Sequence, residues 1–319
     1  MRARASTLSS GHADGGLLQR LRQNSRDLVA LVLAPVAAAA LSDRLAHRLL
    51  NRLARDDWYF ERPGEAVAAA YAAWTGSTPE ASWVHRHRRL ELRDRSDALR
   101  AWTSSTGGYT RMVHLAGDAI PPAPFVGITL HYGAGLWSLR ALRERGIRAS
   151  FLSIPMRRQD YPGRPLMYWF ECARNFIAAR LGNASVTYSA DSYAQLKALL
   201  AAGHSIIGML DVPGVSPKYR RTVDLLGRVI SLPTGLTALA REQNVPILAF
   251  YVRERVPGGG LELVTRVIES GATDPFDQTW AFFRNALERD SAPWHAWSWP
   301  SPSRAFDARP PNRRPGTPP

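Results

Sequence analysis

The stretch Phe-Val-Gly-Ile-Thr-Leu-His-Tyr-Gly-Ala-Gly-Leu-Trp, residues 125–137, decides how the rest of the chain is interpreted. Residues Phe125–Leu130 are mainly apolar and predict a buried strand, and His131 follows directly after it. Catalytic and binding groups of α/β sheets gather at the carboxyl ends of strands. The two glycines that follow would allow a substrate to approach the backbone. The segment therefore predicts an α/β domain with His131 as a candidate general base.

Strand-like and helix-like stretches alternate from this segment onward. The further expected strands are Ala149–Ser153, Ala184–Tyr188, Ser205–Leu210, Val245–Val252 and Leu261–Ile268. The expected helices are Leu136–Arg145, Leu166–Leu181, Ser192–Ala202, Gly235–Gln243 and Phe276–Glu288. This alternation predicts an α/β fold with a mixed central sheet flanked by helices. Between residues 57 and 120 the pattern predicts helices at Ala66–Trp74 and near Ser96–Trp102, with a basic segment between them.

The N-terminal part differs in character. Residues 28–41 are apolar but shorter than the roughly 20 residues that a membrane-spanning helix needs, and Pro35 predicts a kink. A leucine stripe and an arginine face then predict an amphipathic helix on an anionic membrane, although an ordinary packing helix with a solvated basic side fits as well. The stripe is Leu41, Leu45, Leu49 and Leu53, and the basic face is Arg44, Arg48, Arg52 and Arg55.

These patterns divide the chain into four parts. We expect a disordered N-terminus at 1–16, a membrane-associating helical segment at 17–60, the α/β domain at 61–299 and a disordered tail rich in Pro and Arg at 300–319.

The charge and cysteine content narrow the possible functions. The 319 residues include 41 Lys and Arg against 27 Asp and Glu, a net charge of +14, which predicts an anionic partner such as a membrane surface or an acidic carrier protein. No recognisable nucleic-acid module is present, so we expect no nucleic-acid partner. Cys172 is the single cysteine and excludes an intramolecular disulfide and a cysteine zinc cluster.

Other common chemistries are not indicated. The sequence holds no dinucleotide fingerprint, Walker loop or Gly-x-Ser-x-Gly elbow, so we expect no cofactor. His85 and His87 stand among arginines, which disfavour a dication, and they are interpreted as part of a solvated basic turn rather than as metal ligands.

Two further segments carry candidate functional residues. Asp211 follows the strand 205–210 and precedes a basic loop, so it is either a positioned carboxylate or a loop cap. Thr234 precedes a helix that begins at Gly235, either as a plain N-cap or as part of a helix start whose amides face an anionic substrate.

The order of these residues resembles the late acyltransferases of bacterial lipid A biosynthesis, within the lysophospholipid acyltransferase superfamily. The resemblance spans Leu41 to Trp299. His131 matches the family histidine, and Asp211 the later aspartate. The segments Leu226-Gly227-Arg228, Pro233-Thr234-Gly235 and the Trp-rich stretch Pro293–Trp299 are similar to the family's later motifs.

The resemblance implies a function and a location. It implies transfer of an acyl group from acyl carrier protein or acyl-CoA to a lipid or glycolipid acceptor, at the cytoplasmic face of the inner membrane. His131 would be the general base, Asp211 a catalytic acidic residue, and Arg180 the first match for the family arginine. The substrate-binding residues it implies are Tyr132, Gly133, Gly135, Arg174 (also the second match for the family arginine), Gly227, Arg228, Thr234 and Gly235.

One position departs from the family pattern. The acidic member of its His-x4-Asp/Glu motif falls at Leu136, which cannot orient an imidazole. Three interpretations stay open. Another carboxylate, Asp211 or Asp160, supports His131; or His131 works unaided; or the protein is catalytically degenerate and binds lipid or a partner enzyme.

Overall fold

The computed structural model describes residues 16–187, 189, 191–212, 219–257, 259–299 and 302–306. Its centre is a seven-stranded sheet in the order β1-β9-β8-β2-β5-β3-β4, in which all neighbouring pairs are parallel except β8 and β9. The strands are β1 (Val113–Gly117), β2 (Val126–Thr129), β3 (Ala149–Ser153), β4 (Asn183–Thr187), β5 (Ser205–Met209), β8 (Ile247–Glu254) and β9 (Leu261–Ile268). The predicted mixed sheet flanked by helices is confirmed.

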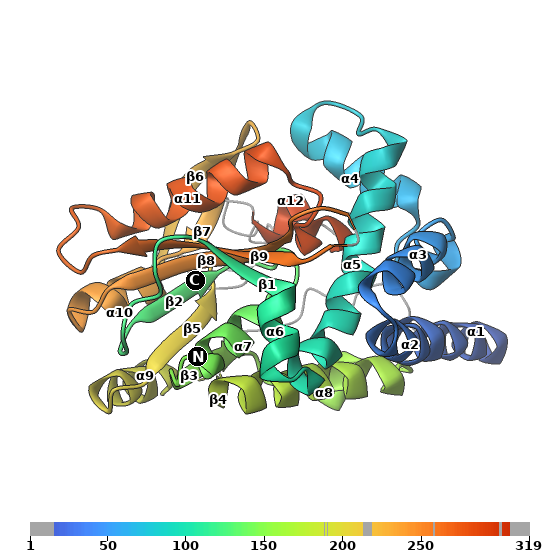
Figure 1. The fold of residues 1–319 in the computed structure, drawn as a ribbon. Coiled ribbons are helices and arrows are strands. Elements are labelled where there is room, and N and C mark those ends of the chain that lie inside the picture. Colours follow the sequence, from blue (N-terminus) through green and yellow to red (C-terminus); the bar gives the residue numbers. More distant parts are fainter. Residues whose placement is uncertain are drawn as a thin grey trace.

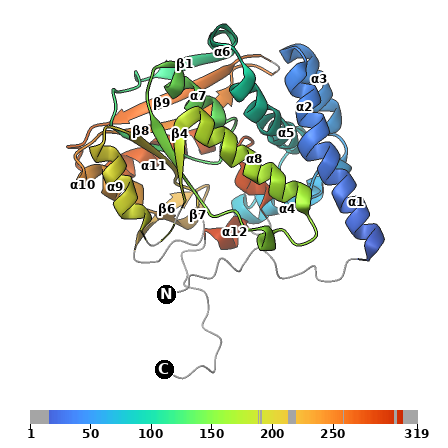
Figure 2. The ribbon, with the colours of Figure 1, turned by 90° about the horizontal axis from the view of Figure 1, so that it is seen from below.

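Helices cover both faces of this sheet, with α11 above it and α8 below it in Figure 1. Side chains alternate between the faces along each strand, so Ile206 belongs to one core and Ile207 to the other. One face carries α9 (Ser192–Ala201), α10 (Gly235–Glu242) and α11 (Pro275–Arg289). The other carries α7 (Leu136–Glu144) and α8 (Pro165–Gly182), and α8 runs across the view from below in Figure 2.

The middle of the chain holds elements that the sequence did not reveal. The basic segment belongs to α5 (Ala81–Thr103), a single helix of 23 residues that joins α4 (Gly64–Thr75) to the sheet, so the predicted solvated turn at His85 and His87 is wrong. His87 is fully buried and stacks on Trp83. A short helix, α6 (Thr106–Met112), then leads into β1, which was also not predicted.

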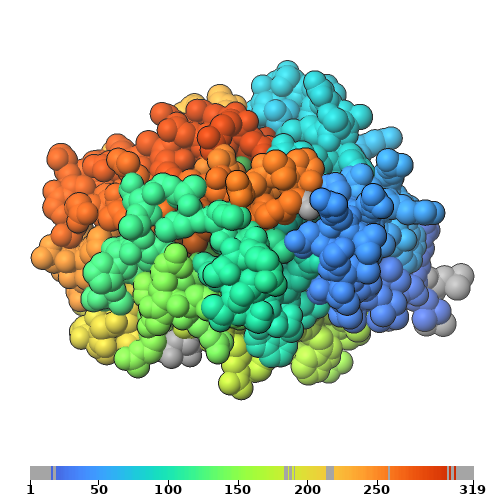
Figure 3. Space-filling view, viewed as in Figure 1, coloured from blue at the N-terminus to red at the C-terminus, as the bar shows by residue number. Residues whose placement is uncertain are grey.

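The N-terminal helices form one end of the molecule, coloured blue in Figure 3. They are α1 (Leu17–Asp27), the π-helical turn η1 (Leu28–Leu33), α2 (Ala34–Ala40) and α3 (Asp43–Leu53). The helical path continues through Pro35, because the wider turn directly before it accommodates the ring and the missing N–H. Small residues such as Ala38 and Ala46 let these helices pack closely on Leu92 of α5.

The C-terminal part of the described chain packs into the main core. The short turn η5 (His295–Ser298) is followed by α12 (Pro302–Ala305), and Phe306 is fully buried in the main core. The prediction of disorder from residue 300 is therefore wrong for this segment, because Phe306 packs against Trp294 and Trp299. Of the predicted disordered segments 1–16 and 300–319, residues 1–15, 300–301 and 307–319 lie outside the described residues.

Three short elements complete the chain. The hairpin β6 (Arg220–Leu225) and β7 (Arg228–Pro233) stands apart from the main sheet, and two single turns, η2 (Asp57–Tyr59) and η3 (Arg158–Asp160), lie in connections.

Candidate active site

His131 and Asp211 meet where β2 and β5 end side by side. The two strands pair in parallel, so the residues that follow them emerge at the same edge of the sheet. The Nδ1 atom of His131 lies 2.9 Å from Oδ1 of Asp211. The backbone N–H of His131 also donates to both carboxylate oxygens, at 3.0 Å each. Asp211 thus fixes the backbone and the ring of His131 together.

The surroundings shift the pKa values of His131 and Asp211 in opposite directions. Burial alone would lower the pKa of His131, but the charge of Asp211 and its hydrogen bond outweigh burial, and the pKa is raised. Burial alone would raise the pKa of Asp211, but the imidazole and the hydrogen bonds from His131 and Trp294 lower it. Asp211 is therefore ionised and holds Nδ1–H of His131 as a donor. Among the described residues, Nε2 makes no hydrogen bond, and the side chain is one-third exposed.

The Trp-rich segment forms a wall of the site. The indole N–H of Trp294, a buried residue, donates to Oδ2 of Asp211 at 2.8 Å. The ring of Trp299 meets the imidazole of His131 edge to face at 5.4 Å and stacks on Phe306. The backbone of His295 donates to the carbonyl of His131 at 2.8 Å. These contacts hold the acid–base pair from the side opposite the sheet.

Gly133 is required by a close approach of two backbones. Its φ is +63°, and a Cβ atom there would lie 1.8 Å from the carbonyl oxygen of Val252. Tyr132 is buried and donates its hydroxyl hydrogen to the carbonyl of Asp290 at 2.9 Å. The sequence predicted both as substrate-binding residues, and their contacts fix the turn after His131. Gly135 is different, because a Cβ there would meet only open space.

The two candidate arginines of α8 have different surroundings. Arg174 donates to Oδ2 of Asp94 on α5 at 2.7 Å, and its charge is close enough to lower the pKa of His131. Arg180 lies less than two turns further on, near the end of α8 that leads into β4, where it is exposed and packs on Phe176. In the described part of the chain Arg180 makes no contact with His131 or Asp211. The second match for the family arginine, and not the first, is therefore the one whose charge acts on the pKa of His131.

Gly227 and Arg228 have structural surroundings. Leu226 and Gly227 form the two-residue turn of the β6–β7 hairpin with φ values of +52° and +77°, the mirror-image turn that hairpins favour. Arg228 donates to the carbonyls of Ala73 and Trp74 at the end of α4. These contacts do not bring the two residues to His131, so their prediction as substrate-binding residues gains no support.

Thr234 and Gly235 begin α10, which leads into β8 and packs against β2. Because α10 runs antiparallel to these strands, its first turn lies at the sheet edge that carries His131. Among the described residues, the side chain of Thr234 makes no capping hydrogen bond to the first turn of α10. The basic loop predicted after Asp211 falls mostly at 213–218, outside the described residues.

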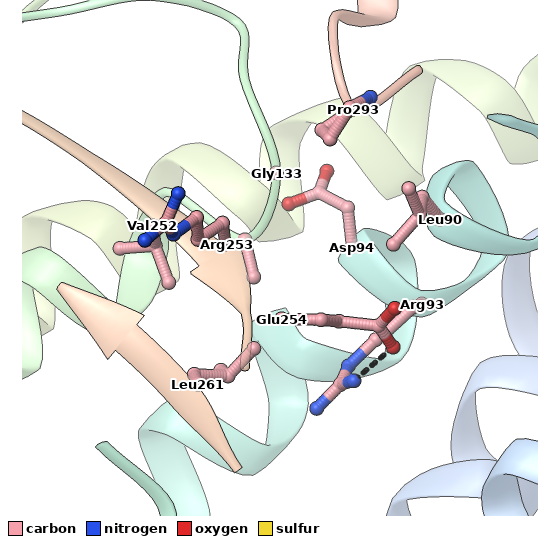
Figure 4. Close-up of a pocket in the computed structure, with 10 residues that line it drawn as sticks. Leu90, Arg93, Asp94, Gly133, Val252, Arg253, Glu254, Leu261 and Pro293 are labelled. Atoms are coloured by element: carbon pink, nitrogen blue, oxygen red, sulfur yellow. Dashed lines mark hydrogen bonds and ion pairs between the residues drawn. The ribbon is translucent and has the colours of Figure 1, made fainter. Parts of the chain in front are cut away.

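Sequence reasoning missed the contribution of α5. Asp94, a buried residue, holds Arg174 and lies 4.0 Å from Nε2 of His295. Figure 4 shows Asp94 pointing toward Pro293, beside a water-sized cavity that Gly133 also lines. Asp160, the other carboxylate considered as a partner of His131, is exposed in η3 and does not contact it. An aspartate inside a basic helix gave no signal of a site.

Metal-binding clusters and membrane-spanning helices are both absent from the described residues. No group of three or more His, Cys, Asp or Glu side chains in these residues is arranged to hold a metal ion. None of the helices in the same residues combines the length and the hydropathy that crossing a membrane demands.

Comparisons with known proteins give a likeness to solved structures and none to known sequences. No protein-family model matches the chain. No curated protein sequence matches it either. Among solved structures, the chain is similar to the 1-acyl-sn-glycerophosphate (LPA) acyltransferase PlsC from Thermotoga maritima, at 12% identity and a TM-score of 0.37. The match covers 79% of this chain and 97% of that one.

Proposed function

We propose that the protein is an acyltransferase that moves a fatty acyl group from a thioester, acyl carrier protein or acyl-CoA, to a hydroxyl or amine of a lipid or glycolipid acceptor. The observation that carries this proposal is the pair His131–Asp211, with Nδ1 bound to a buried carboxylate and Nε2 left for an acceptor proton. The resemblance of the sequence motifs to lipid A late acyltransferases supports the same chemistry.

The chemistry requires one proton relay. Nε2 of His131 removes the proton of the acceptor hydroxyl while its oxygen attacks the thioester carbonyl. The tetrahedral oxyanion then collapses, the C–S bond breaks, and the imidazolium returns the proton to the departing thiolate. Asp211 keeps Nδ1–H in place and stabilises the imidazolium, as the acid of a catalytic triad does. The acid missing at Leu136 is thereby supplied from β5.

Arg174 is our candidate for stabilising the oxyanion. A guanidinium close to the reacting carbonyl favours the negative charge that develops in the transition state. Its ion pair with Asp94, at 2.7 Å, restricts the side chain and gives it a fixed direction. Among the described residues, Arg180 makes no ion pair that would restrict it in this way.

We further propose that the N-terminal helices rest on an anionic membrane. They expose a set of large apolar side chains that are each between 36% and 54% accessible: Leu21, Leu28, Val32, Leu33, Val36, Leu41 and Leu45. Trp169 and Phe176 continue this surface on α8, which packs against α1 and η1. Exposed arginines of α3 flank the patch, the combination typical of interfacial helices. The protein is expected to co-sediment with anionic vesicles but not with zwitterionic vesicles. Failure to co-sediment with either kind of vesicle would contradict the proposal.

The deciding experiment compares membrane lipids by mass spectrometry. Cells of the native organism that produce the chain are set against cells that produce His131→Ala at the same protein level. A species heavier by one acyl group, present only with His131, identifies the acceptor and separates a lipid A precursor from a lysophospholipid or another glycolipid. Identical lipid profiles, with both proteins on the membrane, would leave a lipid-binding protein without turnover.

A further inference from the structure

A second cavity opens at the carboxyl end of β8, on the other side of the turn that follows His131. Its volume is about 390 Å³, within the usual range for small-molecule sites. The lining is entirely charged: Arg253, Glu254, Arg255, Glu262, Arg289 and Asp290. None of these residues belongs to the acid–base pair or to the motifs that the sequence singled out.

The three acidic residues of the cavity are already engaged. Glu254 accepts from Arg89 and Arg93, both buried in α5. Glu262 accepts from Arg253 at 2.5 and 2.7 Å. Asp290 accepts from Arg86, with one contact at 3.0 Å. Each carboxylate therefore has a guanidinium partner, and none contributes a free negative charge to the cavity.

Arg255 and Arg289 are the remaining arginines of the cavity. Within the part of the chain that the structure describes, neither Arg255 nor Arg289 forms an ion pair. Arg289 donates to the hydroxyl of Tyr251 at 3.0 Å, a neutral partner that orients the guanidinium without cancelling its charge. Both residues are exposed at the cavity mouth. Paired guanidinium groups with free N–H donors match the oxygens of a phosphate group better than any neutral ligand.

We propose that this cavity is a phosphate-ester site, with Arg255 and Arg289 as the ligand-binding residues. It lies close to the candidate active site, because Gly133 bridges to Val252 and Tyr132 donates to Asp290. The path runs three residues along the chain from Arg255 to Val252, across one strand spacing, and two residues from Gly133 to His131, so the Cα atoms of Arg255 and His131 are at most about 23 Å apart.

A single extended molecule can therefore reach both places. If the protein is an acyltransferase, the phosphate belongs either to the acyl donor, as in coenzyme A or a phosphopantetheine arm, or to a phosphate-bearing acceptor headgroup. This part of the inference rests on the proposed function, whereas the affinity of the cavity for phosphate does not.

The binding test uses inorganic pyrophosphate and isothermal titration calorimetry at constant ionic strength. Arg255→Ala/Arg289→Ala is expected to bind about tenfold more weakly or worse, since each lost charge-assisted contact is costly. Arg241→Ala/Arg266→Ala removes the same charge from exposed positions elsewhere and is expected to bind like the native chain. Equal affinity in the native chain and the first variant, or an equal loss in both variants, would overturn the proposal.

A competition experiment separates the two sources. Displacement of pyrophosphate by coenzyme A, but not by a short-chain lysophosphatidic acid below its micelle concentration, assigns the site to the donor, and the reverse assigns it to the acceptor. Displacement by neither overturns the phosphate-ester assignment. His131→Ala is expected to bind pyrophosphate normally, so a failure of the acyltransferase proposal leaves this result unchanged and can be told apart from a failure of the site.

Discussion

His131 and Asp211 stand 80 positions apart in the chain, yet Nδ1 of the one lies 2.9 Å from Oδ1 of the other. The contact exists because β2 and β5 are neighbours in the sheet, so that two separate strand ends supply one acid–base pair. In the motif that the sequence resembles, the acid would stand at Leu136, on the helix that follows the histidine. Here the carboxylate that contacts the histidine is Asp211, which follows the neighbouring strand β5.

Replacing Asp211 tests this pair directly. Asp211→Asn keeps the size of the side chain but removes the charge and lets the imidazole adopt the wrong tautomer. The rate of acyl transfer is expected to fall by about 10³–10⁴-fold, as for the acid of a triad. Steady-state release of free thiol from an acyl thioester measures it. Asp160→Asn, an exposed carboxylate on η3, is the matched control and is expected to leave the rate within twofold. A similar rate in both variants would exclude Asp211 from the mechanism.

The pH dependence of the rate follows from the protonation of His131. As a general base the imidazole must be neutral, and its pKa is raised above the ordinary value of 6.5. The rate is therefore expected to increase with pH and to level off only above that raised pKa. In Asp211→Asn the residual activity should level off at a lower pH, because the charge that raises the pKa is gone. A pH–rate profile with the same midpoint in both proteins would contradict this assignment.

The two arginines of α8 form a second matched pair. Arg174→Ala removes the guanidinium that we propose to stabilise the oxyanion and is expected to lower kcat by about 10²–10³-fold, in the range found for single oxyanion-stabilising donors. Arg180→Ala removes an exposed guanidinium that packs on Phe176, and a change of less than twofold is expected.

A further variant separates the role of Asp94 from that of Arg174. Asp94→Asn keeps the arginine but loosens it, so the loss of kcat is expected to be smaller than for Arg174→Ala, with KM little changed. If Arg180→Ala lowers kcat more than Arg174→Ala does, Arg180 and not Arg174 is the oxyanion-stabilising arginine.

The buried ion pairs of α5 make a prediction about stability. Glu254→Gln leaves Arg89 and Arg93 in a buried place without their shared carboxylate, and unfolding free energy is expected to fall by about 3–5 kcal/mol. Glu262→Gln breaks the partly exposed pair with Arg253 and should cost less than about 1 kcal/mol. Urea unfolding of both variants measures the difference. Equal losses would show that Glu254 is no more important than a surface carboxylate.

Glu254 also makes the stability of the fold depend on pH in the acid range. Burial alone would raise the pKa of Glu254, but Arg89 and Arg93 lower it to about 2 from an ordinary value of 4.5. Because the folded pKa is depressed, the stabilisation is complete above pH 4.5 and is lost as the pH falls toward 2. The native chain should lose stability in that interval more steeply than Glu254→Gln. Parallel curves would contradict this account.

The sequence revealed the parts whose signal is local. The strands β2, β5 and β8 are apolar on both faces because they are buried on both, and such runs can be read from the chain. His131 and Asp211 were both singled out because they follow such strands. That they touch depends on strand order, which no spacing reveals.

The other features that the sequence did not reveal also depend on contacts between distant parts of the chain. Arg89 lies 165 positions from Glu254, and a charged residue is read as solvated until its distant partner is known. Arg174 and Arg180 differ by less than two turns of one helix, so only the position of α8 over the sheet edge distinguishes them. The edge strand β1 is mostly exposed and lacks the apolar run by which the central strands were found.

The burial of Phe306 in the core also determines when the site is completed during translation. The indole N–H of Trp294 donates to the carboxylate of Asp211, Trp299 contacts the imidazole of His131, and Phe306 stacks on Trp299. A nascent chain emerging from the ribosome has the sheet strands first and these rings last. The wall beside the acid–base pair is therefore completed only after residue 306 has left the exit tunnel, and translation products that end before Trp294 carry His131 and Asp211 without it.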